Sequence, residues 1–261
     1  MPTSNEIITV ESPEAAVEHG FFCYKSKPKS TGYARKLSWL EQRFQEGLRL
    51  HIVVEDGRSV GFIEYTPAEA AWRPIQAPGY VFIHCIWVVG RAKQKGYGSR
   101  LLDICLQEAR ESGKRGVAMT TKKGGHMAGK KLFLKHGFEL VDREPPFELV
   151  AMTYGDQQLP AWPQDWAERR AALGEGLTVL YADQCPYFDR TAAEVLETAQ
   201  ELGMEPVRAV KLRTAAEVQQ KAPTPYGTYS VVHDGDLLSS TPLVGKRLRK
   251  QLEERLEERE G

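Results

Sequence analysis

Apolar positions in the first 154 residues alternate between strand-like and helix-like spacing. A continuous apolar run from Tyr80 to Val89 predicts a buried strand, and the Asp56-Gly57 pair predicts a hairpin turn between two amphipathic strands. A 3.6-residue period predicts a helix from about Gly98 to Ser112. Further strands are expected over 6–10, 48–57, 59–67, 116–121, 138–142 and 147–154, and further helices over 33–47 and 126–137. This order predicts a mixed α/β unit.

A second pattern of alternating strands and helices begins near residue 177, after a segment rich in proline and tryptophan. We therefore expect a domain over 1–156, a linker over 157–175 and a smaller domain over 176–261. The last helix should bury a stripe of leucines at every fourth position. Strands are expected over 177–184, 205–212, 228–233 and 236–240, helices over 189–203, 214–220 and 245–261, and the stripe at Leu248, Leu252 and Leu256.

Charge and cysteine content narrow the possible functions of the 261-residue chain. Lys plus Arg and Asp plus Glu each number 35, so no net field favours nucleic acid or a membrane as a partner. No leader pattern is evident, and no apolar segment approaches the roughly 20 residues that span a bilayer, so a cytoplasmic protein is expected. The four cysteines are Cys23, Cys85, Cys105 and Cys185. They have neither the spacing of zinc ligands nor that of a disulfide framework, so neither a metal site nor a disulfide scaffold is expected.

A basic, glycine-containing turn separates the strand that ends near Val89 from the helix that follows. The first N–H groups of a helix have no intrahelical partners, and the helix dipole favours an anion there. Gly96 and Gly98 leave the backbone open to a phosphate, and Lys93 and Lys95 add positive charge nearby. The alternative is a tight turn with solvated lysines.

The segment "VVGRAKQKGYGSRLL" resembles the acetyl-CoA-binding motif [Q/R]xxGx[G/A] of the GNAT (Gcn5-related N-acetyltransferase) superfamily. Gly96 and Gly98 match the motif, and Lys93 takes the place of its Gln or Arg. Further along, "KKLFLKHGFELV" resembles the closing segment of the superfamily, with Gly137 and Phe138 in register. The resemblance covers residues 5–154 and implies the acyl-CoA N-acyltransferase fold.

This resemblance implies an enzyme that transfers an acetyl group from acetyl-CoA, its co-substrate, to an amine of a small molecule or peptide. Backbone N–H groups of the glycine turn would hold the pyrophosphate, and the end of the preceding strand would contact the pantetheine arm. The implied binding residues are Ile86, Val88, Lys93, Gly96, Tyr97, Gly98 and Ser99.

The chain departs from the family pattern where a general acid is usual. Phe133 stands in the place of the usual tyrosine and cannot donate a proton, and His126 stands where an asparagine is common. His126 either contacts CoA or assists proton transfer, or it only caps its helix. Glu64 and His84, on neighbouring strands, are candidate general bases, although either could be a satisfied polar residue of the sheet.

Cys185 follows a buried strand and precedes a helix, with Pro186 suited to the first helical turn. Free N–H groups there favour the thiolate, so Cys185 should be the most reactive thiol, whereas Cys105 lies on the apolar side of a helix. The segment resembles the start of a thioredoxin or glutaredoxin domain whose second cysteine has become Phe188, and the combination resembles the YoaP-like GNAT proteins. Pro225, or else Pro223, takes the place of the proline that is often cis in that fold.

Three hypotheses follow from these motifs. The first is an acetyltransferase whose thioredoxin-like domain helps to bind the substrate. The second is a glutaredoxin-like, thiol-handling protein centred on Cys185, and the third is a CoA-binding module without catalysis. Since the second cysteine is missing, Cys185 could act by monothiol exchange, bind a substrate thiol or be inert.

Overall fold

A computed structural model describes residues 5–21, 23, 26–124 and 127–260 of the chain, and His126 lies outside these ranges. The chain divides into two compact units, which are described separately. The first comprises residues 1–71 and 75–162, and the second comprises residues 163–261 together with Trp72–Pro74. The second unit therefore includes three residues from the N-terminal part of the sequence.

The first unit is built on a seven-stranded sheet in the order β1-β2-β3-β4-β5-β7-β6. Neighbouring strands are antiparallel except for β4 and β5, which are parallel. The strands are β1 (Asn5–Val10), β2 (Arg49–Glu55), β3 (Arg58–Pro67), β4 (Tyr80–Val88), β5 (Gly116–Lys122), β6 (Glu139–Glu144) and β7 (Phe147–Thr153). The mixed α/β prediction for this part of the chain is confirmed.

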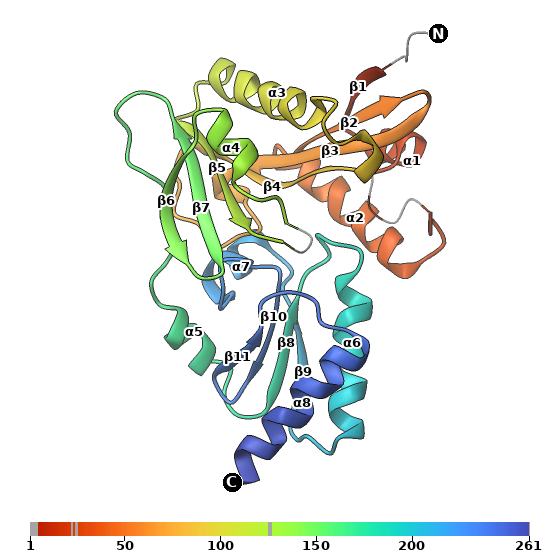
Figure 1. Cartoon of the computed structure of the whole chain (residues 1–261), viewed down its shortest axis with the longest axis vertical. Coiled ribbons are helices and arrows are strands. Elements are labelled where there is room, and N and C mark those ends of the chain that lie inside the picture. Colours follow the sequence, from red (N-terminus) through yellow and green to blue (C-terminus); the bar gives the residue numbers. More distant parts are fainter. Residues whose placement is uncertain (1–4, 22, 24–25, 125–126, 261) are drawn as a thin grey trace. The chain divides into compact units, whose positions relative to one another are not determined.

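Helices cover both faces of this sheet (Figure 1). On one face, α3 and α4 pack on a core that includes Ile63, Tyr65 and Ile83. Because side chains alternate along a strand, Glu64 points to the opposite face, where Lys36 of α2 contacts it. The helices are α1 (Pro13–His19), α2 (Thr31–Gln45), α3 (Tyr97–Glu111) and α4 (Lys131–Lys135), with 3-10 turns η1 (Ala68–Ala70) and η2 (Gly90–Ala92).

The second unit contains a four-stranded sheet in the order β11-β10-β8-β9. β8 and β9 are parallel, whereas β10 runs antiparallel to both β8 and β11. Helix α6 connects the parallel pair, α7 leads into β10, and α8 ends the chain (Figure 1). The elements are α5 (Trp166–Ala171), β8 (Leu177–Tyr181), α6 (Phe188–Glu201), β9 (Val207–Lys211), α7 (Ala215–Lys221), β10 (Tyr229–His233), β11 (Asp236–Ser239) and α8 (Gly245–Glu260).

Most sequence-based elements agree with the structure, and the exceptions have local causes. Leu248 and Leu252 are buried and Leu256 is half-buried, as the leucine stripe predicted. Helix α1 was missed; Ser12 caps its N-terminus by accepting a hydrogen bond from the Ala15 N–H. Helix α4 begins later than expected, at Lys131.

The expectation of a cis bond before Pro225 or Pro223 was wrong, since the cis bonds among the described residues precede Pro146 and Pro206. The Gly227 N–H donates to the Thr224 carbonyl at 3.0 Å, which closes a four-residue turn. Pro225 is the second residue of this turn, where the fixed φ of a trans proline fits.

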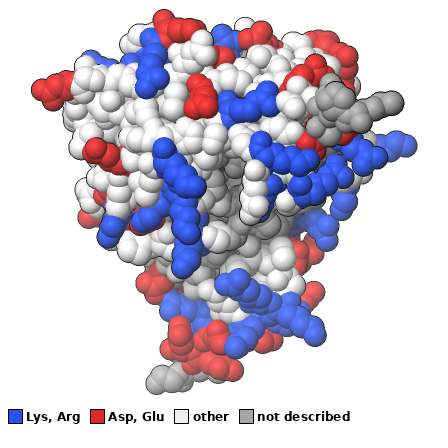
Figure 2. Space-filling view, turned by 45° about the horizontal axis from the view of Figure 1, so that its top comes forward, with Lys and Arg blue, Asp and Glu red and all other residues white. Residues whose placement is uncertain are grey.

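Lys, Arg, Asp and Glu share the face drawn in Figure 2, in keeping with their equal numbers in the chain. No helix among the described residues is long and apolar enough to cross a membrane.

Candidate active site

The turn after β4 has two residues in the left-handed region, Gln94 with φ of 70° and Gly96 with φ of 79°. The N–H of Lys93 already bonds to the carbonyls of Val89 and Gly90, at 3.1 and 3.3 Å. An anion at this turn would therefore meet the N–H groups that follow Lys93. A Cβ built on Gly96 would meet no atom within 4 Å, so the turn is open on that side.

The N-terminus of α3 has the features of an anion site. No side chain caps its first N–H groups, and its N-cap is Gly96. The first backbone hydrogen bond of the helix runs from the Arg100 N–H to the Gly96 carbonyl, at 3.1 Å. The N–H groups of Tyr97, Gly98 and Ser99 come before it, so the helix offers them no carbonyl partner. Since α3 runs for 15 residues, its dipole adds to the attraction for an anion.

Glu55, at the end of β2, fixes two residues of the turn. Its carboxylate accepts hydrogen bonds from Lys95 Nζ, at 2.8 and 3.0 Å, and from the Tyr97 hydroxyl. The hydrogen bond with Lys95 is the largest cause that lowers the pKa of Glu55. Lys95 and Tyr97 therefore hold the turn against β2, and nothing in the local sequence around Glu55 indicates this role.

Strands β4 and β5 separate where the resemblance placed the pantetheine arm. Their pairing runs from Tyr80 with Gly116 to Phe82 with Ala118 and continues no further. Beyond that point β4 carries Ile86, which is buried, and Val88, which is half-buried. These two side chains pack on the α3 side of the sheet.

A β-bulge in β4 brings the two candidate bases together. Glu64 of β3 is paired with Cys85, and Tyr65 is paired with Ile83, so His84 is the extra residue on β4. His84 Nδ1 lies 3.2 Å from Glu64 Oε1. Both side chains are buried, with exposed fractions of 0% for His84 and 4% for Glu64.

Lys36 of α2 is a third member of this cluster, which the sequence analysis did not identify. Its Nζ donates to Glu64 Oε2 at 2.6 Å and lies 4.0 Å from the centroid of the Trp39 ring. Burial alone would raise the pKa of Glu64, but Lys36 and His84 outweigh it and lower the pKa to about 2. Glu64 is thus a carboxylate at neutral pH and a poor base. The sequence did contain one indication that Lys36 is buried: it lies three residues after Tyr33, on the same face of the helix.

Phe133 is fully buried and packs edge-on against Phe138, with ring centroids 5.3 Å apart. It belongs to the core beneath α3 and offers no proton. His126, the other candidate near this segment, lies outside the described residues.

Cys185 is half-buried in the loop between β8 and α6. The helix begins at Phe188 with Tyr187 as its N-cap, so Cys185 lies two residues before the cap and Pro186 lies outside the helix. The expectation that Pro186 belongs to the first helical turn was therefore wrong, whereas Cys185 does precede the helix, as expected. The Phe188 N–H donates to the Cys185 carbonyl at 3.1 Å, which forms a turn before the helix.

Arg73, which belongs to the second unit, supports the loop that carries Cys185. Its guanidinium donates to Gln184 Oε1 at 2.5 Å and to Thr228 Oγ1 at 3.1 Å, and it lies over the ring of Tyr226. The Ala182 N–H also donates to the Thr228 carbonyl at 3.1 Å. The loop after β8 is therefore tied to the segment before β10.

Cys105 is fully buried on α3, and burial raises its pKa well above the ordinary value. This confirms the expectation that Cys105 is hidden and has a raised pKa. A thiol in this state is a weak nucleophile because little thiolate forms near neutral pH.

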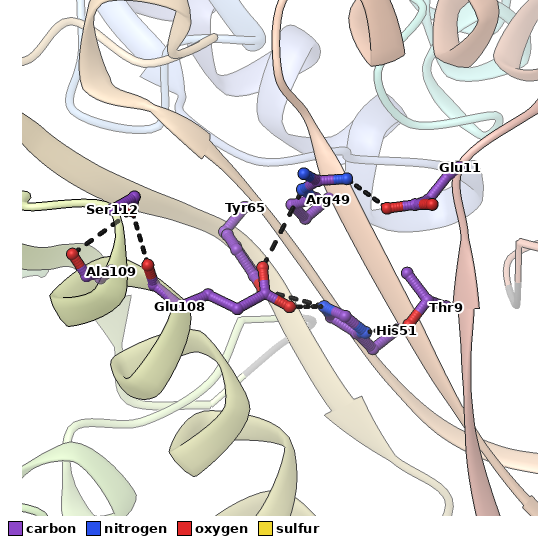
Figure 3. Close-up of polar contacts among 8 residues, drawn as sticks. All are labelled: Thr9, Glu11, Arg49, His51, Tyr65, Glu108, Ala109 and Ser112. Atoms are coloured by element: carbon purple, nitrogen blue, oxygen red, sulfur yellow. Dashed lines mark hydrogen bonds and ion pairs between the residues drawn. The ribbon is translucent and has the colours of Figure 1, made fainter.

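A separate polar network lies on the α3 side of the sheet (Figure 3). His51 Nε2 lies 2.8 Å from the Tyr65 hydroxyl, which donates to Glu108 Oε2 at 2.8 Å, and His51 Nδ1 lies 3.0 Å from Thr9 Oγ1. Burial lowers the pKa of His51, although Glu108 opposes the shift. The network joins β1, β2 and β3 to α3, and its hydrogen bonds account for its buried polar groups.

A family model and a similar protein sequence agree with the acetyltransferase motifs. Residues 15–138 match the model of the acetyltransferase (GNAT) family. A Bacillus subtilis (strain 168) protein described as the uncharacterized N-acetyltransferase YoaP is 33% identical over 249 residues, which cover 93% of this chain and 97% of that protein. The solved PaiA N-acetyltransferase of Thermoplasma acidophilum, in complex with coenzyme A, is 16% identical with a TM-score of 0.40; the match covers 58% of this chain and 99% of that one. A solved aminoglycoside 6'-acetyltransferase type Ii is 17% identical with a TM-score of 0.43, over 60% and 100% of the respective chains.

Proposed function

Since the chain belongs to the GNAT acetyltransferase family, with acetyl-CoA as co-substrate, we propose that it acetylates an amine of a small molecule or peptide and that CoA binds at the turn before α3. The observation that carries this proposal is the N-terminus of α3, which no side chain caps and which follows an open glycine turn. Such a terminus matches the charge and the hydrogen-bond acceptors of a pyrophosphate.

The residues of this unit fit the rest of the co-substrate. The N–H groups of Tyr97, Gly98 and Ser99 would bind the pyrophosphate, and Ile86 and Val88 would contact the pantetheine arm where β4 leaves β5. A Cβ on Gly98 would lie 3.5 Å from Leu132 Cδ2, which is an ordinary contact. Glycine at 98 is therefore not required for packing, and its small size favours close approach of the phosphate to the backbone.

The chemistry that we propose is direct transfer. The acceptor nitrogen attacks the carbonyl carbon of the thioester, a C–N bond forms, the C–S bond breaks, and the nitrogen loses a proton. We assign this proton to His84 rather than to Glu64, because Glu64 is held as a carboxylate of low basicity. His84 is fully buried, so the proton would reach it through an intervening water. Phe133 supplies no acid for the thiolate.

The test is transfer from radiolabelled acetyl-CoA to panels of amines and thiols, with the wild type and His84→Asn. We expect labelled amides with the wild type and a turnover rate that is lower by roughly 100-fold or more in the variant, since general bases contribute that much. An undiminished turnover rate in a folded His84→Asn enzyme would contradict the role of His84. Labelled thioesters without amides would contradict the choice of an amine.

For the second unit we propose a thioredoxin-like domain that helps to bind the acceptor. Numbered within this unit, its strand order is 2-1-3-4 with the first two strands parallel, an arrangement that supports the proposal. The proposed division remains 1–156 for the acetyltransferase domain, 157–175 for the linker and 176–261 for the second domain. Helix α5 and the pairing of Ala161 with Gln76 fall within the proposed linker, so it is structured.

The second candidate function is thiol handling at Cys185. It is favoured by the half-buried position of Cys185 in a loop that Arg73 and Thr228 brace. Acetyl transfer by Cys185→Ser separates the two candidates. Full activity in this variant favours the acetyltransferase with an accessory domain, whereas loss of activity in a folded variant favours the thiol as the chemical centre.

A further inference from the structure

The glycine turn before α3 has a backbone shape that its own sequence does not favour throughout. Gln94 has φ of 70° and Gly96 has φ of 79°, both in the left-handed region. Glycine adopts this region readily, whereas a residue with a Cβ, such as Gln94, does so at a cost. The side chain of Gln94 is exposed. Contacts made by its neighbours must therefore hold the turn in shape.

Two sets of contacts flank this strained position. Before it, the Lys93 N–H donates to two carbonyls of the segment that follows β4. After it, the Glu55 carboxylate accepts hydrogen bonds from Lys95 Nζ, at 2.8 and 3.0 Å, and from the Tyr97 hydroxyl. Because Glu55 is the last residue of β2, its contacts tie the turn to the sheet of the first unit.

The surroundings of Glu55 suit it to this task. Its side chain is only 11% exposed, whereas that of Lys95 is 46% exposed. The hydrogen bond from Lys95 is the largest cause that lowers the pKa of Glu55, and that from Tyr97 adds to it, so Glu55 is a carboxylate at neutral pH. Hydrogen bonds to an ionised acceptor are stronger than those to a neutral one. A half-exposed ion pair adds little to global stability, so these contacts act on the local shape of the turn.

We infer that Glu55 is a positioning residue for CoA binding: it holds Lys95 and Tyr97 so that the first N–H groups of α3 face the pyrophosphate. This inference rests on the proposed binding of CoA at the turn. Lys95 is then an anchor of the turn and not a phosphate ligand, because its ammonium group is bound to Glu55. A turn that is held before CoA arrives does not have to be ordered by binding, and this increases the affinity.

A role as a mere charge would have the opposite consequence. A carboxylate beside an anion site repels an anionic ligand, so on charge alone Glu55→Ala would strengthen CoA binding and release Lys95 to bind a phosphate. If Glu55 positions the turn, the same change weakens binding, because CoA must then order the turn. The sign of the change in affinity therefore distinguishes the two roles.

The experiment measures the dissociation constant of CoA by calorimetry, and kcat and KM for acetyl-CoA, in the full chain. We expect CoA binding to weaken by roughly three- to tenfold in Glu55→Ala and by roughly threefold in Tyr97→Phe, as the loss of one or two hydrogen bonds implies. KM for acetyl-CoA should rise by a similar factor with kcat unchanged, because binding alone is affected.

A rescue variant and a control variant isolate the effect on the turn. Adding Gln94→Gly to Glu55→Ala should restore most of the affinity, because glycine adopts the left-handed region without strain. General destabilisation would not be repaired in this way. The matched control is Glu11→Ala, which removes a carboxylate that pairs with Arg49 at the other end of β2 and should leave the affinity unchanged.

The outcomes that would overturn the inference differ from those that would overturn the proposed CoA site. Unchanged or stronger CoA binding in a folded Glu55→Ala protein overturns the inference, and so does equal weakening in Glu11→Ala; if Gly98→Asp still weakens binding, the CoA site stands. Wild-type affinity in Gly98→Asp overturns the site, and the inference fails with it. Should Glu55→Ala not fold, Tyr97→Phe decides, since it keeps the buried ring and removes only the hydroxyl. Wild-type affinity in Tyr97→Phe would then overturn the inference.

Discussion

Lys36 Nζ lies 2.6 Å from Glu64 Oε2, although each side chain is only 4% exposed. An ion pair buried to this degree loses most of its hydration, so its charges depend on each other and on His84. Such a pair adds little net stability compared with apolar residues, but the loss of one partner is expensive.

We predict that Glu64→Ala destabilises the first unit by about 3–5 kcal/mol, because it leaves the Lys36 charge buried and uncompensated. The double variant Lys36→Met with Glu64→Leu should recover most of this loss. Urea unfolding of the three proteins measures both effects. A loss below about 1 kcal/mol in Glu64→Ala would mean that water reaches the pair.

His51 should make folding sensitive to mild acid. Burial lowers its pKa in the folded state, so below the ordinary value of 6.5 the unfolded chain binds more protons than the folded one. The contribution of neutral His51 to the free energy of unfolding is therefore fully present above about pH 6.5 and decreases as the pH is lowered. Glu64 adds a second loss between its ordinary pKa of 4.5 and about 2.

The measurement is the melting temperature of the wild type and of His51→Gln from about pH 8 to about pH 5, a range that spans the ordinary pKa of histidine. We expect the wild type to lose more stability than the variant over this range, since glutamine does not titrate. Parallel curves for the two proteins would exclude His51 as the source.

Two glycines offer a test of whether the units fold independently. A Cβ on Gly116 would lie 2.2 Å from the Met152 carbonyl oxygen, and a Cβ on Gly176 would lie 2.2 Å from that of Pro206. Gly116→Ala should destabilise the first unit and Gly176→Ala the second, each by about 1–3 kcal/mol or more. Hydrogen exchange followed by mass spectrometry reports on the units separately. Equal loss of protection in both units from either variant would show that they unfold together.

Cys185 should be alkylated faster than Cys105 in the native chain. Cys105 is fully buried with a raised pKa, whereas Cys185 is half-buried in a loop. Limited labelling with iodoacetamide, followed by peptide mapping, gives both rates in one sample, and labelling in urea provides the control for intrinsic reactivity. Faster labelling of Cys105 would contradict the assigned burial, and labelling of Cys85 ahead of Cys185 would remove the reason to regard Cys185 as the chemical centre.

The sequence predicted elements well where a strong local pattern coincides with burial. The apolar run of β4, the glycine turn and α3 are local signals, and the structure has them within one or two residues of their predicted positions. The relation between His84 and Glu64 was less accessible, because it depends on a bulge that changes which residues of β4 face α2. Lys36 was missed for a similar reason: a lysine on a helix is usually solvated, and only the tertiary structure supplies its buried partner.

The second unit shows the same limit. The parallel pair and α6 followed from their periodicity, and α6 begins at Phe188, one residue before its predicted start at residue 189. Arg73 could not be predicted as part of this unit, since it lies far from Pro163 in the sequence and nothing in the local pattern links them. Long-range contacts of this kind are not encoded in a local pattern.

Calorimetric titration of CoA into the wild type, Gly98→Ala and Gly98→Asp tests most directly whether the α3 turn is the CoA site. The Cβ of either variant meets only ordinary contacts in the protein, so both should fold. We predict that the wild type binds CoA, that Gly98→Ala binds it more weakly, and that Gly98→Asp loses roughly tenfold or more in affinity, because a carboxylate then faces the pyrophosphate. Gln107→Glu, which makes the same charge change on the exposed side of α3, should bind as the wild type does. Wild-type affinity in Gly98→Asp would contradict the assignment of the CoA site.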